Sequence, residues 1–438
     1  MNVAFVNPPI PANYFKRREK GFLSKMPLGL LSLASYCQDD FDVKLFDFGG
    51  TTEEELLNHS ALNSFDAICI TLTSISYYIV KKLVRKLREN NDSVLIILGG
   101  AHPSALPLET IQEIECDIIV VGEGEIILHR ILKAFEGNPK NASFFEYLKN
   151  FDCLYFRSAD GISVGTHSYV LDDLDRMPKI DYSLLDIDRY TNLSLLTSRG
   201  CNGKCIFCAG ALIGGVYRRR NLSNIFHELK EGIALKKDGT LFVVDNNFMG
   251  ESHYVEHLLQ KIKEEKIERI FSCESRIGDF DDTLFKTMHS LGFRGIQFGI
   301  ESGSNKILKK VGKGVTRKDV LDVVEKTVNI GFMVAASFII GHPYETREDV
   351  RETVGLIKDL KSMGVQVAVG GLVPYPGTPV FKLRDQLEIK IHSYNWEDYY
   401  EYHPVISTRY FSREELAEIL FGIITETIMD YEGAGGNR

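Results

Sequence analysis

Short, almost wholly apolar segments recur along the first 140 residues, and amphipathic segments separate them. The apolar segments are residues 3–6, 43–46, 67–72, 94–98 and 117–121. The stretches with helical periodicity include residues 28–37, 77–89 and 109–115. Strands that are apolar on both faces and alternate with helices indicate a parallel sheet covered on both sides. We therefore expect an α/β chain whose residues 1–140 form a doubly wound, Rossmann-like domain.

A second alternation of the same kind begins near residue 191. Its expected strands are residues 193–197, 241–244, 270–273, 295–299, 333–340 and 366–369. Six βα units fall short of the eight that close a barrel, so we expect an open, partial (β/α)6 barrel over residues 191–380. The more irregular residues 141–190 are expected to form a linker. We expect residues 381–438 to form a small C-terminal helical cap, with a disordered tail at 433–438.

Charge and hydropathy exclude several classes of protein. The formal net charge is −9 and the pI is near 5.7, which argues against nucleic acid as the main partner. The first residues form a strand rather than a signal peptide, and no run approaches 18 apolar residues. Five of the eight cysteines are scattered irregularly, unlike a disulfide framework. The sequence thus predicts a cytoplasmic protein without a transmembrane segment.

Small and polar residues gather where the strands of the first domain end. Ligands of doubly wound sheets bind beyond the carboxyl ends of the strands, where glycine allows close approach. No G-x-G-x-x-G follows the first strand, so a nicotinamide-type site is not expected. Tight βα turns are the alternative explanation for each loop. The candidate ligand-binding residues are Asn7, Thr71, Thr73, Ser74, Gly99, Gly100, His102, Gly122, Glu123 and Gly124.

Three cysteines, Cys201, Cys205 and Cys208, directly follow the first expected strand of the barrel. Thiolates at this spacing can converge on one 4Fe–4S cluster and leave one iron without a protein ligand. A structural zinc site would need a fourth ligand, and the nearest histidine, His227, lies well along the following helix. We therefore predict these three cysteines to be the ligands of a 4Fe–4S cluster.

The C-x3-C-x2-C motif, with Phe207 before its third cysteine, resembles the motif of the radical S-adenosylmethionine (SAM) superfamily. Weaker similarities to that family lie at residues 298–303, 338–346 and 375–379. The resemblance implies a partial barrel in which the open iron of the cluster binds SAM. It further implies reductive cleavage of SAM to a 5′-deoxyadenosyl radical, with an electron donor such as flavodoxin or ferredoxin.

The N-terminal half resembles the cobalamin-binding domain that is fused to one large class of these enzymes. The similar segments are residues 27–31, 98–103 and 121–125. The D-x-H-x-x-G motif that supplies a histidine to cobalt in other cobalamin proteins is missing. The resemblance implies cobalamin as a second cofactor, bound without that ligand, with Thr71, Thr73 and Ser74 along the channel for its nucleotide tail. For His102 a hydrogen bond within its own loop is the alternative to an approach to the corrin.

The same resemblance implies SAM-binding roles for residues at the barrel strand ends. Glu301, beside Ser302, would bind the ribose or the ammonium group, unless it pairs with a structural arginine. Arg276 would hold the methionine carboxylate, unless it forms a salt bridge with Glu274. Gly341 would let the adenine approach the backbone. The sequence assigns no catalytic side chain.

Methylation of an unactivated carbon is the expected reaction, on a small metabolite, a peptide or a lipid precursor. Three alternatives stay open. The enzyme could cyclise, rearrange or oxidise its substrate with the same two cofactors. Its N-terminal domain could be a vestigial scaffold. The chain could also be an iron–sulfur sensor rather than an enzyme.

Overall fold

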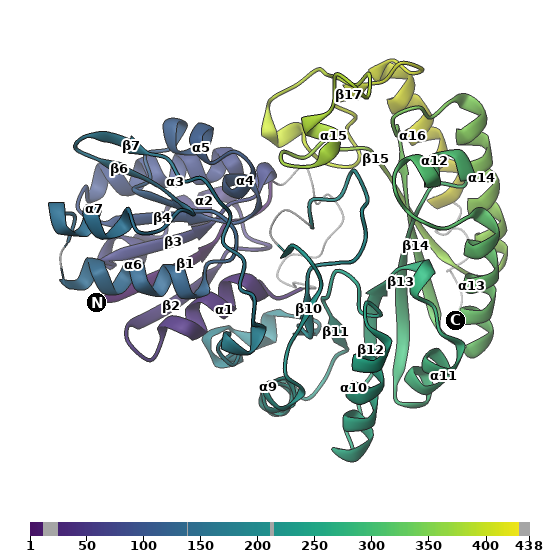
Figure 1. Cartoon of the computed structure of the whole chain (residues 1–438), viewed down its shortest axis with the longest axis horizontal. Helices are drawn as coiled ribbons and strands as arrows, with labels where there is room; N and C mark the ends of the chain where they lie inside the picture. The colour runs from purple at the N-terminus through teal and green to yellow at the C-terminus, as the bar shows by residue number, and fades with distance from the viewer. Residues whose placement is uncertain (12–24, 138, 211–213, 429–438) are drawn as a thin grey trace. The chain divides into compact units, whose positions relative to one another are not determined.

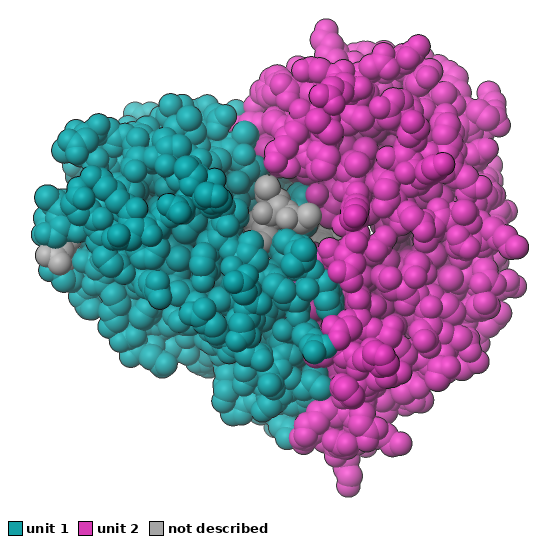
Figure 2. Space-filling view, viewed as in Figure 1, with its two compact units in different colours: residues 1–194, 209–239 teal, residues 195–208, 240–438 magenta. Residues whose placement is uncertain are grey.

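The computed structural model describes residues 1–11, 25–137, 139–210 and 214–428. The chain forms two compact units, one of residues 1–194 and 209–239 and the other of residues 195–208 and 240–438 (Figure 2). The tail that the sequence analysis expects to be disordered, 433–438, lies outside the described residues. Among the described residues, no helix has the length and apolar character needed to cross a membrane.

The first unit is built on a seven-stranded sheet of order β2-β1-β3-β4-β5-β6-β7 (Figure 1). Strands β1 to β5 pair in parallel, whereas β6 and β7 are antiparallel. The strands are β1 (Asn2–Asn7), β2 (Asp42–Asp47), β3 (Ala67–Thr71), β4 (Leu95–Gly99), β5 (Ile118–Val120), β6 (Leu154–Ser158) and β7 (Gly161–Ser163). The predicted doubly wound parallel sheet is therefore confirmed, with an antiparallel extension.

Helices cover both faces of this sheet. In β1, all four residues from Val3 to Val6 are completely buried, which requires cover on both sides of the strand. Helices α1 and α6 contact one another, and so do α2 and α3. The helices of the unit are α1 (Leu28–Cys37), α2 (Glu53–Leu57), α3 (Tyr77–Asn90), α4 (Ala101–Ala105), α5 (Pro107–Glu113), α6 (Glu125–Gly137), α7 (Ala142–Leu148) and α9 (Leu222–Leu235).

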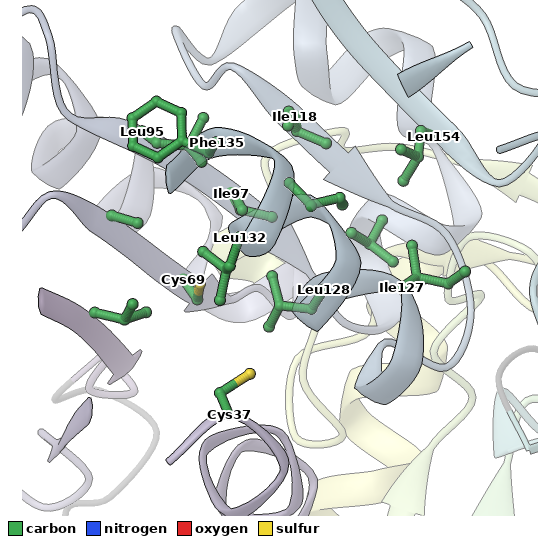
Figure 3. Packing of buried hydrophobic residues seen from close by; sticks show 14 of the residues in the cluster. Cys37, Cys69, Leu95, Ile97, Ile118, Ile127, Leu128, Leu132, Phe135 and Leu154 are labelled. Carbon is green, nitrogen blue, oxygen red and sulfur yellow. The ribbon is translucent and has the colours of Figure 1, made fainter. Parts of the chain in front are cut away.

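A hydrophobic core of the unit lies between the sheet and helices α1 and α6 (Figure 3). Alternate strand residues, such as Leu95 with Ile97 and Ile118 with Val120, face the helices because side chains in a strand alternate between its faces. Leu128 and Leu132 of α6 pack against them, one turn apart on the same side of the helix. Burial of this apolar surface is what holds the sheet and the two helices together.

The second unit is built on six strands in consecutive order, β8-β11-β12-β13-β14-β15. All pairings from β11 to β15 are parallel. The strands are β8 (Leu193–Leu195), β11 (Leu241–Val243), β12 (Phe271–Ser275), β13 (Phe293–Glu301), β14 (Met333–Ile340) and β15 (Gln366–Gly371). The consecutive order of the six strands, with parallel pairing from β11 to β15, confirms the predicted partial (β/α)6 barrel.

Several of the helices that connect these strands begin with side-chain caps. Thr316 and Thr346 each accept a hydrogen bond from the amide of an aspartate three residues on, and each aspartate bonds back. The helices are α10 (Ser252–Glu264), α11 (Asp282–Ser290), α12 (Asn305–Lys310), α13 (Arg317–Ile330), α14 (Arg347–Ser362), α15 (Pro379–Lys382) and α16 (Arg413–Ile428). The short strands are β9 (Ser198–Arg199), β10 (Arg218–Arg219), β16 (Lys390–Ile391) and β17 (Ile406–Ser407).

Two parts of the chain hold more structure than the sequence analysis expects. Residues 142–163, assigned there to a linker, form α7, β6 and β7, and β6 pairs with β5 of the first sheet. The C-terminal region, expected to be a helical cap, pairs β16 with β17 and packs the long helix α16 on β15. The domain boundaries proposed from the sequence stay a prediction.

Candidate functional site

The three clustered cysteines lie in a loop that follows β9. Gly200 begins this loop in the left-handed conformation, with φ +79°, and turns the chain away from the strand. The amide of Gly203 donates to Cys201 Sγ at 3.3 Å, and the amide of Cys208 donates to the carbonyl of Cys205 at 3.2 Å. Cys201 and Cys205 are partly exposed and Cys208 is exposed, whereas the other five cysteines are buried. The accessible thiols are therefore those of the motif.

Two distant segments fix the middle of this cysteine loop through its backbone. The amide of Ile206 donates to the carbonyl of Val311 at 3.1 Å. The carbonyl of Ile206 accepts from the amide of Val380 at 3.0 Å. Both segments follow strands of the barrel, one after β13 and one after β15. The cysteine loop is thus held at the carboxyl ends of the strands.

Two cationic side chains lie beside the loop. A Cβ built on Gly203 would be 3.5 Å from Cζ of Arg276 and 3.3 Å from Cys201 Sγ. Arg276 Nη2 donates to the carbonyl of Lys313 at 3.0 Å. Burial raises the pKa of Cys205, and the charges of Lys313 and Arg276 oppose that rise. The loop therefore combines accessible thiols with cations that favour thiolates.

Glu301 ends β13 in a strained conformation, with φ +77°. Its side chain is buried and pairs with Lys313 Nζ at 3.1 Å. Burial raises the pKa of this carboxyl, which the ammonium of Lys313 counteracts. The structural partner is thus a lysine rather than the arginine considered in the sequence analysis. Ser302 turns to Thr353 of α14 instead, with 3.2 Å between the hydroxyls.

The segment after β14 holds two buried titratable residues. Gly341 has φ +93°, and its amide donates to Glu345 Oε2 at 2.6 Å. Burial raises the pKa of Glu345 to about 8 and lowers that of His342 to about 4. The ring of Phe207 lies 5.6 Å from that of His342. A Cβ on Gly341 would contact Leu416 of α16, so the helix packs close to this backbone.

Six buried side-chain polar atoms of the second unit make no hydrogen bond within the described residues; one lies before β12, and the other five lie at or just beyond the carboxyl ends of β11, β12 and β14. These five are Asn247 Oδ1, Ser275 Oγ, Arg276 Nε, His342 Nδ1 and Glu345 Oε1. Unpaired buried polar atoms are costly, and their grouping at one end of a sheet is typical of a site that binds a polar ligand. The donor set of three thiols beside two cations fits a 4Fe–4S cluster.

No group of three or more His, Cys, Asp and Glu side chains in the described parts of the chain is gathered as around a single metal ion. In a 4Fe–4S cluster each cysteine thiolate binds a different iron. The cysteine Sγ atoms therefore lie farther apart than the ligand atoms around a single metal ion.

In the first unit, the candidate loops after β3 and β4 bind one another. Ser74 Oγ lies 3.0 Å from Nδ1 of His102, whose pKa burial lowers to about 4. The bond differs from the alternative expected for His102, a hydrogen bond within its own loop, because it joins the loop after β4 to the loop after β3. The amide of Leu72 donates to the carbonyl of Gly99 at 2.8 Å, and a Cβ on Gly100 would lie 3.0 Å from Thr71 Oγ1.

Two further side-chain contacts lie nearby, one within the loop after β3 and one at the end of β1. The hydroxyls of Thr73 and Ser76 lie 3.0 Å apart. At the end of β1, Asn7 Nδ2 donates to Asp47 Oδ1 at 2.7 Å. The strand-end polar groups of β1 and β3 are therefore bonded to side chains of their own unit.

The glycine-rich segment after β5 packs against residues 169–171 and binds Arg218. Gly122 has φ +94°, and a Cβ there would lie 2.1 Å from the carbonyl of Tyr169. Buried Glu123 binds both terminal nitrogens of Arg218 at 2.9 Å and accepts from the amide of Leu171 at 2.6 Å. Gly124 packs against Leu33 of α1. Each of these three residues thus has a packing or bonding role within the unit.

Three buried residues that were not predicted as site residues join the candidate site: Lys313, His342 and Glu345. They lie beside the cysteine loop or at the end of β14. His342 and Glu345 stand in the segment 338–346 that resembles the radical SAM family, which was the signal that could have found them. Lys313 carries no such signal.

Comparison with known families decides what kind of chain this is. The B12 binding domain model matches residues 25–132, and the Radical SAM superfamily model matches residues 195–357. The chain belongs to the radical SAM enzymes that carry a B12-binding domain. Each match falls on one of the two predicted folds, and the second begins just before the cysteine loop.

Two relatives match this chain along most of their length. An uncharacterized methyltransferase of Pyrococcus horikoshii, PH0819, is 28% identical over 407 residues, which cover 90% of this chain and 86% of the relative. The anaerobic magnesium-protoporphyrin IX monomethyl ester cyclase of Cereibacter sphaeroides is 23% identical, over 89% of this chain and 64% of the cyclase.

Solved structures show the same fold. The radical SAM methyltransferase TsrM of Kitasatospora setae, with cobalamin and a 4Fe–4S cluster bound, matches with a TM-score of 0.70 and 18% identity. The match covers 90% of this chain and 77% of TsrM. The cobalamin-dependent radical SAM enzyme OxsB matches with a TM-score of 0.76 and 16% identity, over 100% of this chain and 69% of OxsB. This B12-binding radical SAM enzyme thus shares the architecture of both.

Proposed function

We propose that this enzyme is a cobalamin-dependent methyltransferase that acts on an unactivated carbon through a 5′-deoxyadenosyl radical. The observation that carries the proposal is the accessible thiol set Cys201, Cys205 and Cys208 at the carboxyl end of a radical SAM barrel, in a chain that also has a B12-binding domain. When bound, the cluster supplies the electron that cleaves SAM, and cobalamin supplies the methyl group.

The chain's own residues bind and shield these groups. The three cysteines would hold the cluster, and the ring of Phe207, which is tilted against that of His342, would exclude water from one side. Arg276, whose Nε is buried and unpaired, has the geometry to receive the methionine carboxylate. Glu301 would receive the ribose or the ammonium of SAM, and Gly341 would lie against the adenine.

The polar loops of the first unit would face cobalamin. The residues proposed for this role are Asn7, Thr71, Thr73, Ser74, Gly99, Gly100, His102, Gly122, Glu123 and Gly124. His102 is buried and bonded to Ser74, so we propose that it orders the loop rather than binding cobalt.

The substrate is proposed to be a small molecule, with a peptide or lipid precursor as further candidates. TsrM has a structure with tryptophan bound, which supports a small-molecule substrate. The electron donor would be flavodoxin or ferredoxin, and eight free thiols favour the reducing cytoplasm as the location. The net charge of −9 speaks against a nucleic-acid substrate.

A cyclising or oxidising reaction is the second candidate, favoured by the similarity to the Cereibacter sphaeroides cyclase over 89% of this chain. The deciding experiment is anaerobic purification with a reconstituted cluster and added hydroxocobalamin. Stoichiometric cobalt, and transfer of label from methyl-labelled SAM to product, would support methyl transfer. Bound cobalt with an unlabelled product would favour the second candidate, and iron without cobalt would leave the first domain as a scaffold.

A further inference from the structure

Lys313 is a buried lysine in the segment between α12 and α13. Its side chain has 7% of its surface exposed, and its ammonium pairs with Glu301 at 3.1 Å. Its carbonyl accepts the hydrogen bond from Arg276. A buried ammonium costs free energy even when it is paired with a carboxylate, which makes this lysine a candidate for an electrostatic role.

The backbone holds this lysine close to the cysteine loop. A Cβ on Gly312 would lie 2.7 Å from the carbonyl of Lys204 and 3.9 Å from Cα of Cys205. On the other side of Gly312, Val311 receives the amide of Ile206. The segment 311–313 therefore lies against the loop along its length, and Lys313 cannot move away without breaking these contacts.

The charges of Lys313 and its partner are thus held beside the cysteine loop. Lys313 Nζ lies 3.1 Å from Glu301 Oε1, and Arg276, which donates to the carbonyl of Lys313, lies 3.5 Å from a Cβ built on Gly203. Lys313 and Glu301 are buried, so water screens their charges incompletely. A 4Fe–4S cluster gains one negative charge when it is reduced, and its potential depends on nearby charges and hydrogen bonds.

We propose that the ammonium of Lys313 raises the reduction potential of the cluster and that Glu301 limits this effect. The inference rests on the proposed function, since it takes the three cysteines as ligands of the cluster. The step concerned is the transfer of one electron from an external reductant to the cluster, and no bond forms or breaks in it. Lys313 thus favours the charge state that the enzyme needs before it cleaves SAM.

The test is a reductive titration of the anaerobically reconstituted full chain with dithionite and redox mediators, followed by electron paramagnetic resonance. It is made without SAM or cobalamin, so that the potential of the cluster is measured and not the activity. Lys313→Met should make reduction about tenfold less favourable, a shift of ~59 mV to lower potential. Glu301→Gln should shift the potential in the opposite direction, and Lys313→Arg, which keeps the charge, should stay near the wild-type value.

Iron and sulfide analysis separates this inference from the function on which it rests. Wild-type protein that binds no cluster would contradict the proposed function itself. A cluster that is bound in Lys313→Met with an unchanged or raised potential would overturn the inference and leave the proposed function standing. If Lys313→Met does not fold, Glu301→Gln decides: a raised potential supports the inference, and an unchanged or lowered one overturns it.

Discussion

Gly312 packs directly against Lys204, so that a Cβ on the glycine would lie 2.7 Å from the carbonyl oxygen of the lysine. This contact brings the segment after α12 against the loop that carries the three cysteines. Gly312 also has φ +77°, a conformation that side chains disfavour. Any side chain at this position is therefore disfavoured for two independent reasons.

Gly312→Ala should displace the cysteine loop and reduce the iron content of the reconstituted protein severalfold. Gly314→Ala is the matched control, because Gly314 has φ +76° and open space where its Cβ would be. The control should lose only about 1–2 kcal/mol of stability to the left-handed backbone and keep its iron. Equal iron content in the two variants, measured beside their melting temperatures, would show that the contact does not position the loop.

Gly122→Ala tests whether the glycine after β5 is needed for the stability of the first unit or for the binding of cobalamin. Its Cβ would lie 2.1 Å from the carbonyl of Tyr169, so we expect the melting temperature of the first unit to fall by several degrees even without cobalamin. Gly161→Ala is the control, since Gly161 has φ +114° and nothing within 4 Å. A Gly122→Ala protein as stable as this control, but unable to retain cobalamin, would assign the glycine to the cofactor instead.

Substitution of Cys201, Cys205 or Cys208 by alanine should each abolish the cluster, measured as iron and sulfide per chain. Cys273→Ala is the control, because Cys273 is a buried thiol of β12. That variant should keep its iron and lose about 1 kcal/mol of stability, as is usual for a small buried side chain. Retention of a full cluster by any of the first three variants would remove that cysteine from the ligand set.

The strands of both units were predictable because long apolar runs leave little choice of structure. The five parallel strands of the first sheet appear where the sequence predicts them. Four of them, β1, β3, β4 and β5, are buried almost throughout, whereas the edge strand β2 is only partly buried. Strands β6 and β7 escaped prediction because they lie at an edge of the sheet and include Arg157 and Ser158 among their residues. A half-exposed strand of mixed residues has no strong periodic signal.

The candidate site could be predicted from the sequence only in part. The spacing of the three cysteines predicts their loop, because ligands close in sequence carry their own signal. The pairing of Glu301 with Lys313, and of Ser302 with Thr353, depends on where the chain returns after twelve or more residues. Gly122 likewise meets Tyr169 only in the folded unit. Such partners are set by tertiary packing, so a motif indicates that a residue matters without showing which group it binds.

Glu345 offers a prediction about pH. Its pKa of about 8 in the folded protein exceeds the value of about 4.3 expected for an unfolded glutamate, so the folded state binds the extra proton. Its contribution to stability is fully present below about pH 4.3 and is lost as the pH rises toward 8. In Glu345→Gln the amide oxygen can still accept from Gly341 but cannot ionise. The stability difference between variant and wild type, measured by denaturant unfolding from pH 5 to 8, should therefore grow in favour of the variant, by at most about 1.4 kcal/mol per pH unit.

Comparing the two proteins at each pH also removes the opposing contribution of His342. The pKa of His342 is about 4 in the folded protein and about 6.5 in the unfolded chain, so this residue makes stability rise between those two pH values. A difference that does not change with pH would show that Glu345 is ionised in the folded protein and bonded through both of its oxygens.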